Sequence, residues 1–562
     1  MLEVLSRSQR GRICELRKNG VTIRTPVLLR TVDRSADADC IPQIYVSVDD
    51  RARALVVGDD KILMDRGLRT VASSDARSPP HDDNGVCVLR LPLTGDEVIP
   101  EDTDITVISN AFELRKDPRR MVDTIMHIRM KIGNNSLLYA PGLADPSNLA
   151  LLTYMGVDVF DDSLPVSAGR LGMLYIPEGE IFTDQDVSQR NIDEIAAECS
   201  KVTMFISSGR LRELVDQRVS SPSLVAALRI FDRVGYEYQE EMCSTVGGRF
   251  SCNTTQSLFR PEVRRFRKMI SERYVPPEHK RILVLLPCSA KKPYHTSKTH
   301  KAFASAIHTG DHDTLVHEVI VTSPLGIVPR ELDVFFPASS YDIPVTGEWK
   351  CQEREIIRGM LSELLEFGYD EVISHLGDAT DLIRELTDLT ETSVGDPASP
   401  ASLNNLENAV RDAAAGMERC GYHKDRQENI RSVLRFQFGK DAADALMHNT
   451  DVTGKFPYWK MHSGKEQIGM LSPERGMVSL TLEGAERLAA AGVSVAEMAD
   501  FEMKGNLFAV GVSKADRNIR AGDEVAVTMN GTVKAVGVAA MSGAEMEDLS
   551  RGIAVKVRHK AK

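Results

Sequence analysis

The chain has 562 residues, of which 42% are hydrophobic and 27% are charged, and its formal net charge is −12. This length exceeds a single hydrophobic core and predicts several domains. The composition is that of a soluble globular protein, and no stretch is apolar over the length that a bilayer span requires. We therefore expect a cytoplasmic protein without a membrane partner.

The cysteines are scattered singly and form no CxxC pair, which argues against a disulfide framework and against a zinc site of the usual spacing. We expect reduced thiols, no metal and no cofactor. Cys288 differs from the others because it follows an apolar run and lies among basic residues, which favour a reactive thiol.

Positive charge is concentrated in two stretches. Residues 260–301 hold twelve Lys or Arg against three Glu, and the last twelve residues hold five Lys or Arg and no acid. Because salt screens charges beyond about 8 Å, such stretches can bind phosphate locally, although they also suit ordinary solvated helix faces. In the first stretch the RNA-binding candidates are Arg264, Arg265 and Lys268.

The first 275 residues alternate short apolar strands with helical patterns. This alternation predicts parallel strands with crossover helices, and the length allows a (β/α) barrel. The predicted strands are Ile44–Val48, Ala54–Val57, Val86–Leu91, Ile105–Ser109, Ser136–Tyr139, Val157–Phe160 and Thr203–Ile206. Asp161 and Asp162 follow one of them, where a carboxylate can act as a nucleophile or base, or simply cap the strand.

A second α/β unit is predicted around Pro287–His300, the sequence PCSAKKPYHTSKTH, which we call the motif loop. It follows the apolar run Ile282–Leu286, and open α/β sheets place their chemistry in such strand-end loops. Strands Glu318–Thr322 and Glu371–Ser374 end in similar loops, and Tyr341–Trp349 (YDIPVTGEW) adds another. We expect these loops to converge on one pocket.

The remaining chain reads as a linker and two small domains. Ser393–Leu403 is Pro- and Ser-rich and is predicted to be a linker. Helices are expected at Leu406–Met417 and Ile430–Phe436, and a hairpin is expected around the turn Asn530-Gly531.

Two parts of this chain resemble known families of RNA-modifying proteins. Gly156–Gly172 is similar to the stretch of tRNA-guanine transglycosylases that carries the nucleophile, and Asp161 falls on that residue. The family's DSGGF motif survives only as Ile108–Phe112, with isoleucine in place of the acid, and its CxCxxC zinc cluster is absent. The resemblance implies a degenerate barrel that no longer exchanges bases and serves as a scaffold for tRNA or the modified base.

The C-terminal pattern GDEV…AVG…MSG…RGIAVKVRH is similar to a PUA domain. The resemblance implies RNA contact through basic residues that position the phosphate backbone. Our candidates are Lys514, Arg551, Lys556 and Arg558.

Taken together, these features resemble the archaeosine synthase family over nearly the whole chain, most specifically at the motif loop. The resemblance implies an enzyme that adds an amine to the nitrile of 7-cyano-7-deazaguanine in the D-loop of tRNA, which gives an amidine. The amine donor would be free lysine or glutamine. The implied partners are the tRNA and a separate radical SAM enzyme that cleaves a lysine adduct, and a homodimer is an open alternative.

The expected fold is a multidomain α/β and α+β chain. We expect a transglycosylase-like (β/α) barrel over 1–275, an α/β core domain with the motif loop over 276–400, a small α+β domain over 401–480 and a PUA β-barrel over 481–562.

Addition to a nitrile needs a nucleophile or an oriented amine, and donors for the nitrile nitrogen. Cys288 is a candidate nucleophile that forms a thioimidate, with its thiolate favoured by Lys291 and Lys292. Alternatively, Cys288 only packs under the loop and the amine attacks directly. The lysines can equally serve tRNA phosphate.

Other motif-loop side chains have supporting roles in this hypothesis. His300, or else His295, would move protons, and Tyr294 and Ser297 would donate hydrogen bonds to the nitrile or the base. Asp378 would hold the ammonium group of the donor. Two other functions stay open: an active transglycosylase, disfavoured by Ile108, and a non-catalytic tRNA-binding protein, which leaves the motif loop unexplained.

Overall fold

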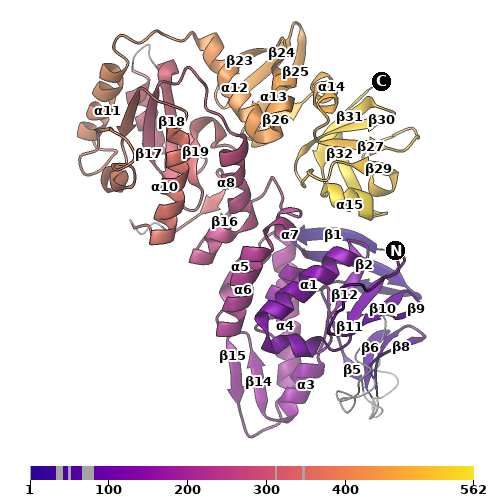
Figure 1. The fold of residues 1–562 in the computed structure, drawn as a ribbon. Coiled ribbons are helices and arrows are strands. Elements are labelled where there is room, and N and C mark those ends of the chain that lie inside the picture. The colour runs from indigo at the N-terminus through magenta and orange to yellow at the C-terminus, as the bar shows by residue number, and fades with distance from the viewer. Residues whose placement is uncertain are drawn as a thin grey trace. The chain divides into compact units, whose positions relative to one another are not determined.

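The computed structural model describes residues 2–32, 42–48, 52–65, 81–309, 313–344 and 348–561. They form two compact units (Figure 1). Unit 1 holds residues 1–242, 508–510 and 544–553, and unit 2 holds the rest of the chain. None of the helices in these ranges has the length and apolar character to cross a membrane.

Unit 1 is built on a six-stranded sheet in the order β4-β13-β12-β11-β10-β9. All neighbouring pairs are parallel except β9 with β10. The strands are β4 (Val27–Leu29), β9 (His81–Asp83), β10 (Val86–Leu89), β11 (Ile105–Ile108), β12 (Leu137–Tyr139) and β13 (Val159–Asp161).

Different layers cover the two faces of this sheet, because successive strand side chains point to opposite faces. Ile108, Leu138 and Phe160 pack with helices, whereas Val107 and Tyr139 pack with two small sheets. The helices are α1 (Pro118–Ile132), α2 (Leu149–Met155), α4 (Ser188–Ser207), α5 (Leu211–Arg218) and α6 (Pro222–Val234). The small sheets contain β1 (Leu2–Ser8), β2 (Gly11–Lys18) and β3 (Val21–Arg24), and β5 (Thr31–Val32), β6 (Ile44–Val48), β7 (Arg53–Val57) and β8 (Asp60–Asp65).

The predicted parallel β/α arrangement is confirmed, and it is degenerate: in the described part of the chain no strand after β13 joins this sheet. The predicted strand Thr203–Ile206 is wrong, because these residues belong to α4. Ile195, Cys199, Val202 and Ile206 are buried at the helical spacing of three or four residues, which a short apolar run conceals.

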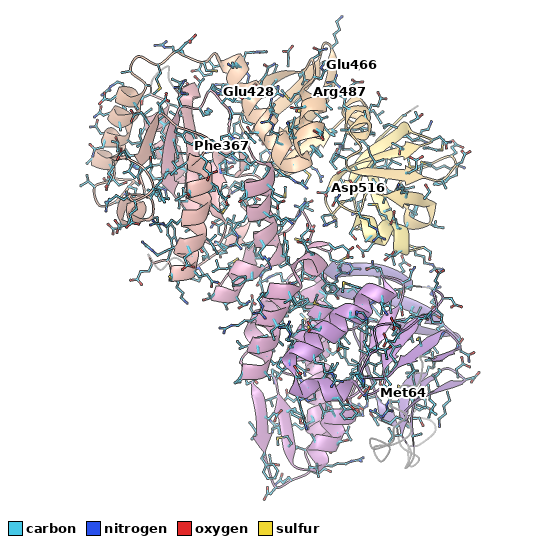
Figure 2. The ribbon with its side chains drawn as sticks, viewed as in Figure 1. Met64, Phe367, Glu428, Glu466, Arg487 and Asp516 are labelled. Atoms are coloured by element: carbon cyan, nitrogen blue, oxygen red, sulfur yellow. The ribbon has the colours of Figure 1, made fainter. Side chains whose placement is uncertain are left out.

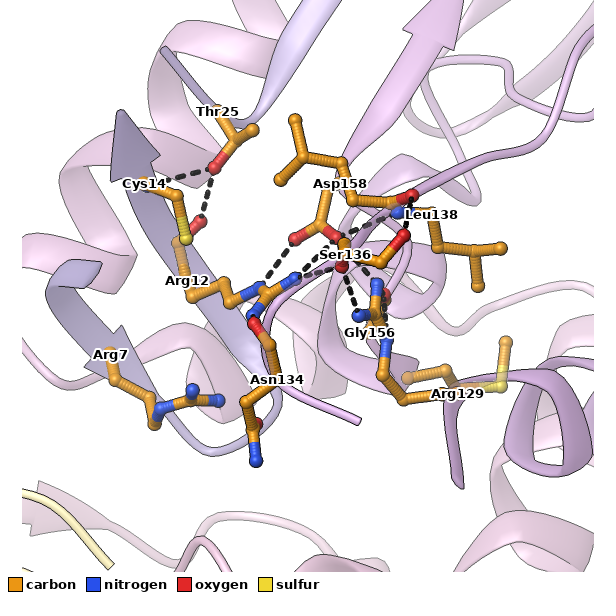
Figure 3. A network of polar contacts seen from close by, with 12 residues as sticks. Arg7, Arg12, Cys14, Thr25, Arg129, Asn134, Ser136, Leu138, Gly156 and Asp158 are labelled. Carbon is orange, nitrogen blue, oxygen red and sulfur yellow. Dashed lines mark hydrogen bonds and ion pairs between the residues drawn. The ribbon is translucent and has the colours of Figure 1, made fainter. Parts of the chain in front are cut away.

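A buried charge cluster ties β2 and α1 to the start of β13 (Figure 3). Asp158 accepts hydrogen bonds from Arg12 Nε at 2.9 Å, from Arg129 Nη2 and from the Leu138 backbone N–H at 2.9 Å. Burial alone would raise the pKa of Asp158, but the two guanidiniums hold it at about 2. The carboxylate is therefore ionised and fully paired.

Unit 2 begins with a five-stranded sheet in the order β19-β18-β17-β21-β22. Its strands are β17 (Ile282–Pro287), β18 (Val316–Thr322), β19 (Gly326–Pro329), β21 (Glu371–Ser374) and β22 (Thr390–Glu391), all parallel to their neighbours except β19. Val284 and Leu286 pack on α9 (Lys298–Ile307) and α11 (Pro400–Ala413), whereas Leu283 and Leu285 pack on α8 (Pro261–Arg273) and α10 (Cys351–Leu365). Both faces of β17 are thus buried, as its continuous apolar run predicts.

The predicted linker Ser393–Leu403 is only partly correct. Helix α11 begins at Pro400, and the Ser399 hydroxyl caps it by accepting from the Ser402 N–H at 3.2 Å. Leu406 and Val410 of this helix share a core with β17. A Pro-Ser sequence that looks like a linker is here a helix start, since proline is well tolerated in the first turn.

The next segment is α+β, as predicted. It contains α12 (Tyr422–Phe438), α13 (Lys440–Met447) and an antiparallel sheet of β23 (Asp451–Lys455), β24 (Tyr458–Ser463), β25 (Glu466–Ser472) and β26 (Met477–Leu480), followed by α14 (Leu482–Ala490). Arg487 of α14, labelled in Figure 2, donates to the His448 carbonyl at 2.6 Å and to Thr450 Oγ1 at 3.0 Å. These bonds fasten α14 to the end of α13.

The C-terminal sheet has the order β28-β32-β31-β30-β27-β29. Its strands are β27 (Val495–Met498), β28 (Leu507–Phe508), β29 (Val512–Ala515), β30 (Glu524–Met529), β31 (Thr532–Ala539) and β32 (Ile553–Lys560). The predicted hairpin is confirmed as the antiparallel pair β30 and β31. Asn530 and Gly531 turn it with φ of 53° and 74°, the left-handed conformation that this residue pair favours.

Candidate active site

The motif loop lies at the carboxyl end of β17, between two parallel neighbours. β17 pairs with β18 on one side and with β21 on the other. The loops that follow these three strands therefore meet at one edge of the sheet, as predicted. Val345–Gly347 of the YDIPVTGEW loop lie outside the described residues.

Three buried hydroxyl groups form the base of the site, and we call Tyr294, Thr322 and Tyr341 the hydroxyl cluster. Tyr341 Oη hydrogen-bonds to both other hydroxyls, and Tyr294 Oη lies 3.3 Å from Thr322 Oγ1. Thr322 ends β18, and Tyr341 belongs to β20 (Tyr341–Asp342). All three side chains are buried, so the cluster forms the interior side of the site.

Cys288 and Lys292 lie on this hydroxyl cluster. The Thr322 hydroxyl is within hydrogen-bonding reach of the Cys288 thiol. Lys292 Nζ lies 4.0 Å from the centroid of the Tyr341 ring and 5.7 Å from that of the Tyr294 ring. A thiol and an amine thus share one polar and aromatic floor, and neither side chain is completely buried.

Burial has the largest effect on the pKa of both groups. It raises the pKa of the Cys288 thiol, and the opposing effects of Thr322 and Lys292 are smaller. It also lowers the pKa of Lys292, although the Cys288 side chain and Asp342 act in the other direction. Lys292 favours the Cys288 thiolate, as expected, but desolvation outweighs its attraction and the pKa of the thiol is raised.

His300 is a structural neighbour of this site. It is buried in the first turn of α9, its Nδ1 accepts a hydrogen bond from Arg330 Nη2 at 2.9 Å, and its ring lies 5.2 Å from that of Tyr294. Burial, together with the Arg330 charge, lowers the pKa of His300 to about 3. The ring is neutral at physiological pH and holds Tyr294 in place. Ser297 caps the same helix by accepting from the His300 N–H at 3.1 Å.

His295 occupies a more open position. Its Nδ1 lies 2.9 Å from Asp333 Oδ1, and its backbone N–H donates to Asp333 Oδ2 at 2.8 Å. Asp333 is buried and also accepts from Arg330 Nη1 at 3.3 Å. The ring orientation is therefore fixed by a carboxylate, as in other oriented imidazoles.

The other predicted members of the site are Lys291 and Asp378. Both are exposed. No hydrogen bond or ion pair joins Asp378 to the motif loop in the described part of the chain. Within the same part, no group of three or more His, Cys, Asp or Glu could hold a metal ion.

Asp161, the predicted nucleophile of the transglycosylase-like part, is fully engaged by its surroundings. Oδ2 accepts from Tyr139 Oη at 2.7 Å and from the Gly142 N–H at 3.1 Å, and Oδ1 accepts from both the N–H and the hydroxyl of Ser163. Its side chain is buried, and so is Ile108 at the end of β11. This arrangement suits a carboxylate that holds loops together.

The RNA-binding candidates Arg558 and Arg265 lie beside acidic groups of the protein. Arg558 pairs with buried Glu524 and donates to the Leu480 carbonyl at 2.6 Å. Burial raises the pKa of Asp523, and the nearby Arg265 guanidinium partly opposes this rise. All seven candidates are at least partly accessible: Arg264, Arg265 and Arg551 are half-buried, and Lys268, Lys514, Lys556 and Arg558 are exposed.

Sequence reasoning missed Thr322, Tyr341 and Asp333 as parts of the site. Thr322 is the last residue of a predicted strand, and Tyr341 opens a loop that the sequence did place near the pocket. The position of Thr322 and Tyr341 at strand ends could have identified them from the sequence, whereas no sequence feature marked Asp333.

Family models match four successive parts of the chain. Residues 94–226 match queuine tRNA-ribosyltransferase, 263–410 match a domain of unknown function, 428–492 match the patch-forming domain C2 of tRNA-guanine transglycosylase, and 489–561 match the PUA domain. The fold and these matches define a tRNA-modifying enzyme of the transglycosylase-related class.

Close relatives narrow this class. The chain is 35% identical over 502 residues to archaeosine synthase subunit alpha of Methanosarcina acetivorans, which covers 81% of this chain and 80% of the relative. It is 32% identical to archaeosine synthase subunit alpha of Thermoplasma acidophilum, over 82% and 89% of the two chains, and 30% identical to archaeosine synthase of Haloferax volcanii, over 83% and 84%. The chain belongs to the archaeosine synthase family.

Proposed function

We propose that this enzyme of archaeosine biosynthesis joins an amine to the nitrile carbon of 7-cyano-7-deazaguanine in tRNA and that the motif loop is its active site. The observation that carries this proposal is the placement of Lys292 and Cys288 side by side on the hydroxyl cluster, at the carboxyl end of β17. A proton-transfer group and a weak hydrogen-bond donor are what addition to a nitrile requires.

The reaction balances without an oxidant, a reductant or a leaving group. The donor ammonium gives up a proton, and its nitrogen then forms a bond to the nitrile carbon. One π bond of the nitrile breaks, and its electron pair moves to the nitrile nitrogen, which takes up a proton. The product is an amidine that carries the donor's positive charge.

Lys292 is the proton carrier in this proposal. Its lowered pKa favours the neutral amine, which accepts the proton of the incoming ammonium. The lysine then returns the proton to the nitrile nitrogen. Cys288 stays a thiol and donates a hydrogen bond, since burial raises its pKa and disfavours the thiolate that a thioimidate requires.

Substitution of Cys288 by alanine separates direct addition from covalent catalysis. Direct addition predicts that the variant keeps its rate of adduct formation within about tenfold, because only one weak hydrogen bond is lost. Single-turnover assays with cyano-deazaguanine tRNA measure this rate. Loss of all adduct formation in a folded Cys288→Ala protein, together with a trapped protein–RNA species in the wild type, would favour the thioimidate.

Nucleoside mass spectrometry tests the function itself. The protein is mixed with cyano-deazaguanine tRNA and with either lysine or glutamine. We expect a mass gain equal to one intact lysine and no product with glutamine, because glutamine carries an amide in place of the side-chain amine that would add to the nitrile. An unchanged nitrile with both donors would contradict the proposal.

The other parts of the chain have supporting roles in this proposal. The transglycosylase-like unit and the PUA domain would hold the tRNA, with Lys514 and Lys556 as the exposed phosphate contacts. The same proposal includes the four predicted domains and a cytoplasmic location. It also includes a homodimer and a partner radical SAM enzyme that cleaves the adduct. Base exchange by the first unit is disfavoured by the engagement of Asp161 and by Ile108.

A further inference from the structure

Arg249 and Asp342 form an ion pair close to the proposed active site. Arg249 Nη2 lies 2.7 Å from Asp342 Oδ2, and the two side chains are 74% and 39% exposed. Both residues belong to unit 2, as does the motif loop. The pair thus presents one positive and one negative group to solvent, side by side.

The backbone holds this pair firmly. Strand β16 (Phe250–Ser251) runs parallel to β20, and the Cys252 N–H donates to the Asp342 carbonyl at 2.7 Å. The guanidinium of buried Arg260 lies 4.6 Å from the centroid of the Phe250 ring and stiffens β16 further. Because Tyr341 precedes Asp342 and belongs to the hydroxyl cluster, the position of the pair relative to the site is fixed.

Both members of the ion pair act electrostatically on Lys292. Asp342 raises the pKa of Lys292 and Arg249 lowers it, and both act in addition to burial. Lys292 Nζ in turn lies 4.0 Å from the centroid of the Tyr341 ring. Asp342 of the pair and Tyr341, whose ring Lys292 faces, are thus consecutive residues of β20.

We propose that Arg249 and Asp342 bind the α-amino acid end of the free amine donor. The Arg249 guanidinium would take the α-carboxylate, and the Asp342 carboxylate would take the α-ammonium, while the side-chain amine of the donor reaches Lys292. Guanidinium and carboxylate groups match these partners in charge and geometry. An exposed ion pair contributes little to stability, so exchanging its partners for those of the ligand costs little. This inference rests on the proposed function and assigns the donor subsite.

A donor series tests the subsite. Lysine is compared with cadaverine, which lacks the carboxylate, and with 6-aminohexanoate, which lacks the α-amine. In the wild type lysine has the highest kcat/KM. Arg249→Ala is expected to raise the KM for lysine by about 10- to 100-fold and to remove the preference for lysine over cadaverine, the loss expected for one charged hydrogen-bond partner. Asp342→Asn is expected to remove the preference for lysine over 6-aminohexanoate.

Arg358→Ala is the matched control. Arg358 of α10 pairs with Glu385 at 2.6 Å in the same unit, and this pair is also exposed. This variant should keep the wild-type KM for every donor. An Arg249→Ala enzyme that keeps the preference for lysine over cadaverine, or in which only the KM for tRNA rises, would overturn the subsite while the proposed function stands. A wild-type enzyme that forms no adduct with any amine would overturn both.

Discussion

Replacement of Lys292 by methionine is expected to slow adduct formation by about 10²- to 10⁴-fold, the usual contribution of a general acid–base group. Methionine has a similar unbranched length and keeps the apolar contact with the Tyr341 ring, but it can neither accept nor return a proton. The loss should fall on kcat, because the proton moves during the chemical step.

The pH profile makes this test specific. Burial lowers the pKa of Lys292, so the wild-type rate should rise with pH as this ammonium loses its proton, at a lower pH than for a free lysine side chain. The methionine variant should lack this rise. Lys291→Met, a change of the exposed neighbour, should stay within about twofold of the wild type. A Lys292→Met enzyme with the wild-type rate and profile would exclude Lys292 as the proton carrier.

Replacement of Asp158 by asparagine is expected to lower the free energy of unfolding by about 3–5 kcal/mol. The change leaves the guanidiniums of Arg12 and Arg129 buried without a counter-charge. Denaturant unfolding, followed by a probe in unit 1, measures this loss. The control Asp123→Asn removes an exposed pair with Arg119 at 3.6 Å and should change stability by less than about 1 kcal/mol.

The same variant has a predicted dependence on pH. The pKa of Asp158 is about 2 in the folded protein against an ordinary value of 3.8. Because the folded pKa is the lower one, the ionised carboxylate stabilises the fold above pH 3.8, and this contribution is lost as the pH falls toward 2. The difference between the wild type and Asp158→Asn should therefore shrink in that window. A difference that stays constant down to pH 2 would contradict the assigned role.

The sequence predicted the features that local pattern encodes. The apolar run Ile282–Leu286 predicted β17, and its polar continuation predicted the place of the site. The partners of Cys288 were harder to find, because Thr322 and Tyr341 are distant in sequence and meet it only through the folded sheet. The direction of the Cys288 pKa shift was mispredicted, since a count of neighbouring lysines does not reveal how strongly burial acts on the thiol.

The misassigned strand Thr203–Ile206 has a related cause. Four apolar or β-branched residues in a row fit a buried strand and a buried helix equally well, and only the longer spacing back to Ile195 distinguishes them. Secondary structure was therefore least predictable where a single short window carried the assignment.

The engagement of Asp161 bears on any attempt to engineer base exchange into this chain. Its two oxygens hold Tyr139, Gly142 and Ser163. A carboxylate introduced at position 108 would therefore have to act with an Asp161 that is already hydrogen-bonded to these three residues. Engineered base exchange would need both a carboxylate at position 108 and the release of Asp161 from these hydrogen bonds. The release would lower the stability of the fold, so the hydrogen bonds of one buried aspartate couple a change of function here to a loss of stability.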